Sequence, residues 1–480
     1  MATFLKYSLS FLFLVIAFAN TAQTIFFKSY GGDGNDYGEN IIHCLDSGFI
    51  AIGGTESYGN GLMDLYLIKT DSIGNVEWHK TFGGPNIDYG KSVVQTSDSG
   101  FIACGYSNSW NMNYDIFIVK VDKNGNHEWT KNYGGDDWDF GHCIIKSNTN
   151  PQELFIGGQT YSYGEGDGDA FLLKINQQGD SLSMKTFGGS QKDSYSSLIE
   201  DHTGNLYCVG AHTVNNEEKL WISKINPNMD TIWNYYSDTT NSSGKSITKI
   251  GNKLIYCGNH TPTINNPASL VYFFGGGIDT NGQHQFQIDY GHHTEYDEAC
   301  IKVIAKPNSN DYYLISNYFN NGDNNIFYAE LNNQYQISGT SKIKGNGNDY
   351  VHGADTITNK NGFVVIGNTE ETTNGFTDIF ISITSNGNWD NNFSNNLLLN
   401  ISKPKKPKLA IYPNPSSQII FFKENIPFKK MTLIDEQGRI IDQFSTNNSS
   451  YNISHLKAGK YWLSFRNNSG EKELISFIKL

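Results

Sequence analysis

One short stretch recurs along the chain at a regular interval. The sequence WHKTFGGPNIDYG at residues 78–90 returns as WTKNYGGDDWDFG at residues 129–141, with the tryptophan, the two glycines, the acid and the last glycine at the same spacing. The two glycines, or a remnant of them, begin at Gly31, Gly83, Gly134, Gly188, Gly291 and Gly345. The 103 residues between Gly188 and Gly291 are close to two periods, and a degenerate copy lies near residues 235–246. The sequence therefore predicts seven repeated units, and repeats of this length indicate a solenoid or a propeller.

Each unit contains four short apolar runs separated by turn residues. In the second unit the runs are YGKSVVQT (89–96), GFIACGYS (100–107), YDIFIVKVD (114–122) and HEWTKNY (127–133). Runs rich in Val, Ile, Phe and Tyr between Asp, Asn and Gly are typical of β-strands, and no helical period competes with them. A lone four-stranded sheet leaves both faces uncovered, whereas seven sheets around one axis cover each other. We therefore predict an all-β chain with a seven-bladed β-propeller whose first strands are innermost, followed by a small C-terminal β-sandwich.

Two features are consistent with a closed ring. Seven innermost strands converge on the axis, where bulky side chains would clash, and one position of the first strand is small in every copy. Its residues are Asn40, Ser92, Cys143, Ser197, Ser246, Ala299 and Gly353. The ring also needs a join between the ends of the repeat, and we expect residues 25–30 to form the outermost strand of the seventh sheet. Residues 388–394 are the competing choice.

The N-terminal residues predict export. Lys6 precedes the apolar run LSFLFLVIAFA, which is too short to span a bilayer and lies where a signal peptide has its apolar region. We expect residues 1–22 to be a signal peptide cleaved after Ala22, with the pair Ala17 and Ala19 as the other option. No later stretch predicts a transmembrane segment.

Six cysteines in an exported chain invite a disulfide interpretation, but their positions argue for buried free thiols. Cys104 and Cys257 occupy the place that Ile52 has in the first unit, and Cys208 occupies the place of Ala51.

The charge is unevenly distributed and excludes nucleic acid as a partner. Residues 403–480 hold 11 Lys, 2 Arg and 6 acids, a net charge of +7. The formal net charge of the whole chain is −13, so the residues before 403 carry −20. The only arginines are Arg439 and Arg466, so the propeller has no guanidinium for phosphate or guanine and an acidic field that repels a polyanion.

The last part of the chain has a different composition. A linker at residues 395–408 ends in a Pro/Lys segment, and residues 409–480 contain alternating strands. Three elements stand in order there: YPNP at Tyr412, Pro413, Asn414 and Pro415; Asp435 with Gly438; and Leu456, Gly459 and Tyr461. Together they resemble the type A C-terminal sorting domain of cargo for the type IX (Por) secretion system of Bacteroidetes. The resemblance implies contact with the type IX secretion machinery and delivery to the outer-membrane surface or the extracellular space.

The repeated units resemble bacterial SBBP-type β-propeller repeats, a family with no single activity. We expect the domains to be a signal peptide at 1–22, a propeller at 23–394, a linker at 395–408 and the sorting sandwich at 409–480.

No motif spells out a catalytic or cofactor site. In GGPNIDYGKS, a phosphate loop would need glycine where Pro85 stands. The oxygen-rich DKNGN (122–126) and GDGD (166–169) do not continue to the Glu of a calcium loop, so we expect turns there and keep calcium as the alternative. No cofactor and no catalytic residue is predicted.

One face of the propeller carries the candidate binding residues. In a four-stranded meander, the connections between strands two and three and between consecutive sheets share one end, and an acid recurs there. The acids are Asp36, Asp88, Asp139, Asp193, Glu295 and Asp349, with Ser242 replacing the acid in the fifth unit. Aromatic residues in the same loops are Tyr58, Trp110, Tyr114, Trp138, Tyr161, Tyr163 and Phe319.

Two interpretations stay open for these residues. The acids either bond their own loops or bind a ligand, and the aromatic rings either pack between sheets or stack on sugar rings. We predict a monomeric, exported binding protein with a carbohydrate or protein ligand on this face. The alternatives are an extracellular glycoside hydrolase or lyase on the propeller, and a structural spacer.

Overall fold

A computed structural model describes the chain over residues 26–239, 241–260, 272–289, 298–320, 323–334, 336–343, 348–357, 362–370, 377–384, 411–412, 418–422, 431–435, 439–444, 450–466 and 472–479. The regular structure of these residues is all β, as predicted. Within these ranges, no helix is long and apolar enough to cross a membrane.

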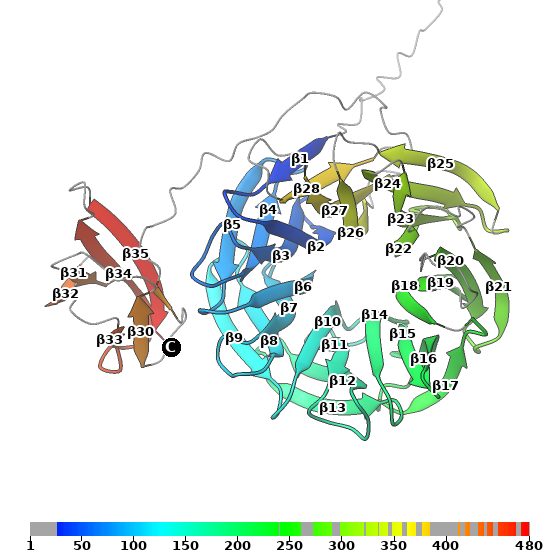
Figure 1. Cartoon of the computed structure of the whole chain (residues 1–480), viewed down its shortest axis with the longest axis horizontal. Coiled ribbons are helices and arrows are strands. Elements are labelled where there is room, and N and C mark those ends of the chain that lie inside the picture. Colours follow the sequence, from blue (N-terminus) through cyan, green and yellow to red (C-terminus); the bar gives the residue numbers. More distant parts are fainter. Residues whose placement is uncertain are drawn as a thin grey trace, which may run out of the picture.

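Residues 27–383 form seven antiparallel sheets of four strands, which we call blades 1 to 7 (Figure 1). Blade 1 has β2 (Asp36–His43), β3 (Phe49–Thr55), β4 (Asp64–Thr70) and β5 (Val76–Phe82). Blade 2 has β6 (Asp88–Gln95), β7 (Phe101–Ser107), β8 (Asp115–Val121) and β9 (His127–Tyr133). Blade 3 has β10 (Asp139–Lys146), β11 (Glu153–Thr160), β12 (Asp169–Asn176) and β13 (Ser181–Phe187). Blade 4 has β14 (Asp193–Glu200), β15 (Leu206–Val214), β16 (Glu217–Ile225) and β17 (Thr231–Tyr236).

The later blades repeat this order. Blade 5 has β18 (Ser242–Ile250), β19 (Lys253–His260), β20 (Tyr272–Asp279) and β21 (His284–Asp289). Blade 6 has β22 (Glu298–Ala305), β23 (Tyr312–Asn320), β24 (Asp323–Leu331) and β25 (Ile337–Ile343). Blade 7 has β26 (Asp349–Ile357), β27 (Gly362–Thr369), β28 (Asp378–Ile383) and β1 (Phe27–Tyr30).

The blades close into a ring. The first strand of each blade contacts the first strand of the next, and β26 of blade 7 contacts β2 of blade 1. The N-terminal strand β1 pairs antiparallel with β28, with Phe27 opposite Ser382 and Tyr30 opposite Ile379. This confirms residues 25–30, rather than residues 388–394, as the source of the outermost strand of the seventh sheet; residues 388–394 lie outside the described residues. The seven-bladed β-propeller predicted from the repeat is the observed fold.

The hydrophobic core of the propeller lies between neighbouring blades and not within a single blade. Every residue of β3 and β4 is buried, whereas the outermost strand β5 is mostly half-buried or exposed. The cluster between blades 1 and 2 joins Ile52 and Leu67 to Val93 and Phe117. All six cysteines are buried free thiols within this packing, as their positions predicted.

The strands around the axis each carry a bulge at the same place. Their pairing shifts between Gly38 and Asn40 in blade 1, and the equivalent step recurs in every blade. At the closing junction the fit is tight, because a Cβ added to Gly353 would lie 2.7 Å from the backbone oxygen of Glu39. The prediction of a small residue after the bulge is correct in six blades and wrong in blade 6. There the register runs three residues later, and Lys302 instead of Ala299 takes the position.

The C-terminal residues form two further sheets. One contains β29 (Ile411–Tyr412), β30 (Ile419–Phe422) and β33 (Ser450–Asn452), and the other contains β32 (Ile440–Phe444), β31 (Met431–Ile434), β34 (Gly459–Arg466) and β35 (Lys472–Lys479). Their shared core includes Ile420 from the first sheet with Leu433, Leu463 and Phe477 from the second. Two sheets around one core make the predicted β-sandwich.

The closing strand generates the first prediction. Tyr30 is 1% exposed, and its hydroxyl donates a 2.8 Å hydrogen bond to the Gly74 carbonyl of blade 1. We expect Tyr30→Ala to lower the free energy of unfolding by about 3–5 kcal/mol, since it empties a large buried site. Tyr30→Phe keeps the ring and should cost about 1 kcal/mol. Urea unfolding measures both, and equal stability of Tyr30→Ala and the parent chain would contradict closure by β1.

Candidate functional site

The recurring acids are buried inside the loops that carry them. Asp36, Asp88, Asp139, Asp193 and Asp349 are all 0% exposed. Each of the first four accepts a hydrogen bond from the amide of the second glycine of its pair, for example Gly84 N to Asp88 Oδ2 at 2.7 Å. Three of them also accept a bond from a serine in the neighbouring loop of the same blade, as Ser109 does to Asp88 at 2.6 Å.

These contacts explain why the glycines recur. A Cβ on the first glycine would collide with two carboxylates: at Gly83 it would lie 2.4 Å from Asp64 Oδ1 and 2.5 Å from Asp88 Oδ2. A Cβ on the second glycine would collide with the loop serine, at 2.6 Å between Gly84 and the Cβ of Ser109. The repeated motif is therefore a loop clamp, and the acid at its end is the acceptor that holds it closed.

The burial of the described acids favours the interpretation that they hold their own loops over the interpretation that they contact a ligand. A carboxylate that is fully buried and already bonded to its own loop has no surface left for a ligand. Ser242 fills the same role in blade 5: its hydroxyl accepts a bond from Leu220 N at 2.9 Å and donates to the Thr239 carbonyl at 2.6 Å. In blade 6 the equivalent register position belongs to Glu298, at the start of β22, because of the three-residue shift. Glu295, the predicted acid, lies outside the described residues.

The clamp generates a second prediction. Gly83→Ala should destabilise the fold by about 1–3 kcal/mol, because the new methyl group meets two buried carboxylates. Gly339→Ala on β25 is the matched control, since nothing lies within 4 Å of a Cβ there. Thermal unfolding compares the two, and equal melting temperatures would exclude the clamp.

At four blade junctions the clamp acid faces a second carboxylate across the first glycine. The pairs are Asp36 with Asp378, Asp88 with Asp64, Asp139 with Asp115, and Asp193 with Asp169. Burial raises the pKa of Asp88 to about 6, against hydrogen bonds that lower it. Burial, and then the charge of Asp36, raise the pKa of Asp378 to about 7. The loops therefore hold carboxyl groups that resist ionisation.

These shifts generate a third prediction. A carboxyl whose folded pKa is raised stabilises the fold below its ordinary pKa and loses that contribution as the pH rises through the raised value. Asp378→Asn should therefore gain stability relative to the parent chain between about pH 4 and about pH 7. Urea unfolding at pH 5 and pH 8 tests this, with the exposed Asp167→Asn as control. The same stability difference at both pH values would contradict it.

The predicted aromatic residues divide into two groups. Tyr114, Trp138 and Tyr161 lie together, with Trp138 6.2 Å from each of the other two rings, and Trp138 is 50% exposed. Tyr106 and Phe140, which the sequence did not single out, complete what we call the aromatic cluster.

The remaining predicted rings have structural contacts. Trp110 packs on the buried Phe117 at 5.1 Å. The Tyr58 hydroxyl donates to the Gly31 carbonyl at 2.6 Å, and the Tyr163 hydroxyl donates to the Gly134 carbonyl at 2.8 Å. Tyr163 is nonetheless 45% exposed beside the loop of Trp138. The side chain of Phe319 lies outside the described residues.

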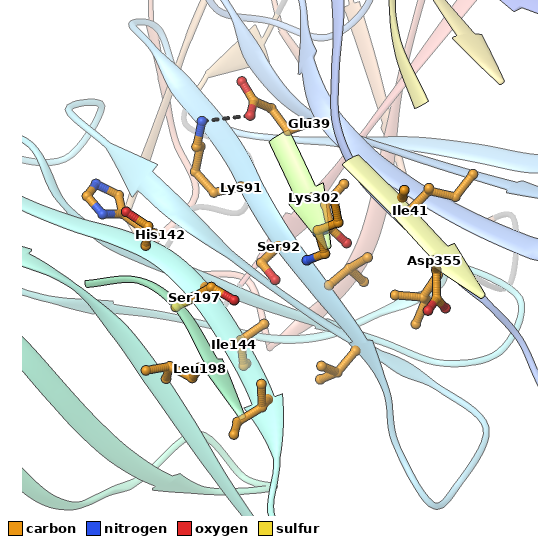
Figure 2. Close-up of a pocket in the computed structure, with 18 of the residues that line it drawn as sticks. Glu39, Ile41, Lys91, Ser92, His142, Ile144, Ser197, Leu198, Lys302 and Asp355 are labelled. Carbon is orange, nitrogen blue, oxygen red and sulfur yellow. Dashed lines mark hydrogen bonds and ion pairs between the residues drawn. The ribbon is translucent and has the colours of Figure 1, made fainter. Parts of the chain in front are cut away.

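A central cavity of about 570 Å³ runs along the axis and was not predicted as a site (Figure 2). The bulge explains its chemistry, because the extra residue of each innermost strand lines it. The seven bulge residues are Glu39, Lys91, His142, Ser196, Lys245, Ile301 and His352. Further along the strands the lining includes the apolar Ile42, Val94 and Ile145 together with the charged Lys146 and Asp355.

The charged side chains at the level of the bulge residues interact with one another. Lys91 Nζ donates to Glu39 Oε2 at 2.7 Å, and the Tyr89 hydroxyl donates to Glu39 Oε1 at 2.8 Å. Burial alone would raise the pKa of Glu39, but the charge of Lys91 holds it below its usual value. Burial, and then the charge of Lys91, lower the pKa of His142 to about 4, so this imidazole is neutral at physiological pH.

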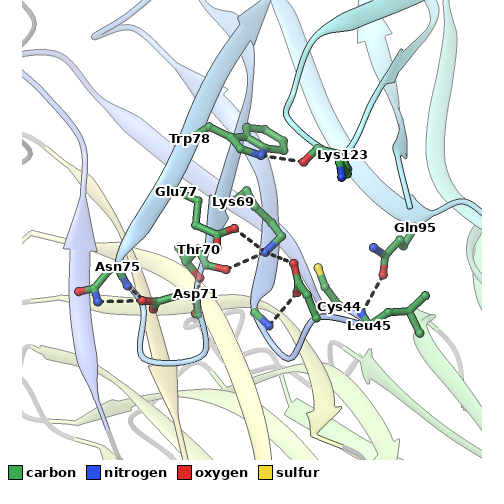
Figure 3. Close-up of polar contacts among 12 residues, drawn as sticks. Cys44, Leu45, Lys69, Thr70, Asp71, Asn75, Glu77, Trp78, Gln95 and Lys123 are labelled. Atoms are coloured by element: carbon green, nitrogen blue, oxygen red, sulfur yellow. Dashed lines mark hydrogen bonds and ion pairs between the residues drawn. The ribbon is translucent and has the colours of Figure 1, made fainter. Parts of the chain in front are cut away.

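The opposite face consists of tight hairpins whose polar groups are used internally (Figure 3). Lys69 is buried, with its Nζ 2.8 Å from Asp46 and 2.9 Å from Glu77. Trp78 Nε1 donates to the Lys123 carbonyl of the next blade at 3.1 Å.

The two candidate calcium stretches are loops in which an aspartate accepts hydrogen bonds from nearby backbone amides. Asp122 Oδ1 accepts bonds from the amides of Asn124 and Asn126, both at 2.8 Å. Asp169 Oδ2 accepts bonds from Glu165 and Gly166. Among the described residues no group of three or more His, Cys, Asp or Glu side chains is placed to hold a metal ion.

Residues 410–478 match the family model described as a secretion system C-terminal sorting domain. This part of the chain is a type IX sorting domain. The chain is therefore an exported propeller protein, delivered to the cell surface or the extracellular space.

Within the sorting domain, the predicted motif residues that the structure describes are engaged in its fold. Asp435 Oδ2 accepts a 2.7 Å bond from Arg439 Nε, and the buried Tyr461 donates from its hydroxyl to the Lys457 carbonyl at 3.0 Å. Tyr412 belongs to β29 and Gly459 begins β34. Pro413, Asn414, Pro415 and Gly438 lie outside the described residues.

The solved structures most relevant here share low sequence identity with the chain. PorZ, a surface component of the type IX secretion system of Porphyromonas gingivalis, has 12% identity and a TM-score of 0.33, covering 95% of this chain and 70% of its own. Sqt1 of Chaetomium thermophilum has 10% identity and a TM-score of 0.45, covering 76% and 98%. The propeller domain of the trilobed protease of Pyrococcus furiosus has 10% identity and a TM-score of 0.43, covering 76% and 99%. No curated protein sequence matches the chain significantly.

Proposed function

We propose that the propeller is an extracellular carbohydrate-binding module whose ligand lies on the aromatic cluster. The observation that carries the proposal is an exposed indole held among other rings: Trp138 is 50% exposed and has Tyr114, Phe140 and Tyr161 within 6.3 Å between ring centroids. Flat, exposed rings held by their neighbours stack on the C–H faces of pyranoses without losing side-chain freedom on binding.

The cluster is rigidly attached to the ring of blades. The Tyr161 amide donates to the Trp138 carbonyl at 2.8 Å, and the Asp139 amide donates to the Tyr114 carbonyl at 2.7 Å. These bonds join loops of blades 2 and 3. The cluster therefore spans a blade junction, as a preorganised binding surface requires.

Export completes the proposal. We propose that residues 1–22 are removed as a signal peptide, that the propeller ends near residue 394, and that residues 409–480 direct the chain through the type IX system. The sorting-domain match at residues 410–478 supports this route.

Binding provides the fourth prediction. Trp138→Ala and Tyr161→Ala should each weaken saccharide binding at least tenfold, measured on a glycan array and by calorimetry with the glycans that score highest. Ile232→Ala, an exposed apolar residue on the outermost strand β17, is the control and should bind like the parent chain. Unchanged binding by both aromatic variants, at unchanged melting temperatures, would exclude the cluster as the site.

Export provides the fifth prediction. In the native organism, a chain lacking residues 409–480 should stay inside the outer membrane, whereas the full chain should reach the surface or the medium. Cell fractionation with immunoblotting measures this. Equal amounts of both chains outside the cell would contradict the assigned route.

A further inference from the structure

Contacts between side chains lead from the aromatic cluster toward the central cavity. Tyr89 stacks on Tyr106 of the cluster at 5.6 Å, and Lys91, two residues further along the same strand, places its Nζ 5.5 Å from the Tyr89 ring centroid. On the next blade Phe140 of the cluster stacks on His142 at 6.5 Å. Two strands therefore lead from the exposed rings to the polar level of the cavity.

The cavity is basic in a propeller that is otherwise acidic. Its charged lining residues are Lys91, Lys146, Lys245 and Lys302 against Glu39 and Asp355, a formal excess of two positive charges with both histidines neutral. The chain up to residue 402 carries −20, since the formal total is −13 and residues 403–480 carry +7. The field inside the cavity is therefore opposite in sign to that of the domain around it.

Two of these lysines have no acid bound to them. Lys91 is paired with Glu39, but among the described residues neither Lys245 nor Lys302 has a carboxylate oxygen within ion-pair distance, and no hydrogen bond occupies their ammonium groups. Lys302 stands where other blades have a small residue, and Figure 2 shows it among the residues that line the cavity. The inner strands already crowd the axis, so a long charged side chain such as Lys302 is not needed there for packing.

We infer that the ligand of the aromatic cluster is an acidic saccharide, whose oxyanion enters the cavity and is bound by Lys245 and Lys302. This inference rests on the proposed function and names its substrate class. An ammonium group is a strong donor to carboxylate and sulfate oxygens, and partial desolvation in a cavity strengthens the pairing. The acidic outer surface does not prevent it, because at physiological salt its charges are screened beyond about 8 Å.

The ligand is a saccharide that carries a single oxyanion, and not a long polyanion. A nucleic acid would lay many phosphates along the acidic surface, whereas a single carboxylate or sulfate meets the local lysines alone. Uronate and sulfate sugars share this chemistry, so the test includes both.

The test uses calorimetry on the full chain with a galacto-oligosaccharide that carries one terminal galacturonate, and with the methyl ester of that galacturonate, in which a neutral ester replaces the charged carboxylate. Lys245→Ala combined with Lys302→Ala should weaken binding of the acidic oligosaccharide at least tenfold and leave binding of the ester unchanged. Lys123→Ala combined with Lys192→Ala removes two exposed lysines outside the cavity and is the control of equal charge. A galacto-oligosaccharide with a single sulfate and its unsulfated form make the second arm, and tighter binding of either acidic form identifies the source of the oxyanion.

Each result decides between the two proposals. If the acidic and neutral forms bind equally and the cavity variant changes neither, the inference is wrong while carbohydrate binding stands. If none of these saccharides binds and the glycan array is also empty, the proposed function fails and the inference with it. A loss equal to that of the control variant would also overturn the inference, because it would reflect net charge alone.

Discussion

The meeting of seven inner strands around one axis is the constraint on which the rest of the molecule depends. Strands that converge leave room for few side chains, so the position after the bulge is small in six blades. The bulge itself follows from the same crowding, since an extra residue lets each strand bend at the axis. Because that residue has no place in the ladder, it lines the cavity. The device that closes the ring thus also sets the chemistry of its centre.

The loops on one face are fixed by buried carboxylates rather than by surface charge. In blades 1 to 3 the clamp joins the second glycine of the repeat, an acid and a loop serine, and the first glycine fits between two carboxyl groups. Such a loop holds its side chains in place without an external ligand. Trp138 lies in one of these loops, three residues beyond Gly135, and owes its fixed, exposed position to it.

Sequence reasoning recovered the repeat, the strand order, the closing strand and the sorting motif because each has a local signal with a fixed spacing. The sequence also contains a signal from which the burial of the acids could have been predicted. The loop after the second strand reads Thr-x-Ser at residues 55–57 and 160–162 and Ser-x-Ser at 107–109, which supplies the hydroxyl partners of the clamp.

The cavity residues had no such signal. A bulge adds one residue without changing the apolar pattern, and the seven bulge residues include acid, base, hydroxyl and alkyl side chains, so the copies share no residue type there. The three-residue shift of blade 6 was missed because counting from Gly291 assumes a loop of standard length. Long-range register, and not local propensity, decides both features.

The closing junction between β26 and β2 offers the most direct test of the ring. Gly353 and Glu39 are distant in sequence, yet a Cβ at Gly353 would lie 2.7 Å from the Glu39 carbonyl oxygen. The melting temperature of Gly353→Leu should therefore fall well below that of Gly339→Leu, which adds the same side chain where no neighbour lies within 4 Å. Equal melting temperatures for the two variants would mean that these strands do not meet, and the account of the ring would be wrong.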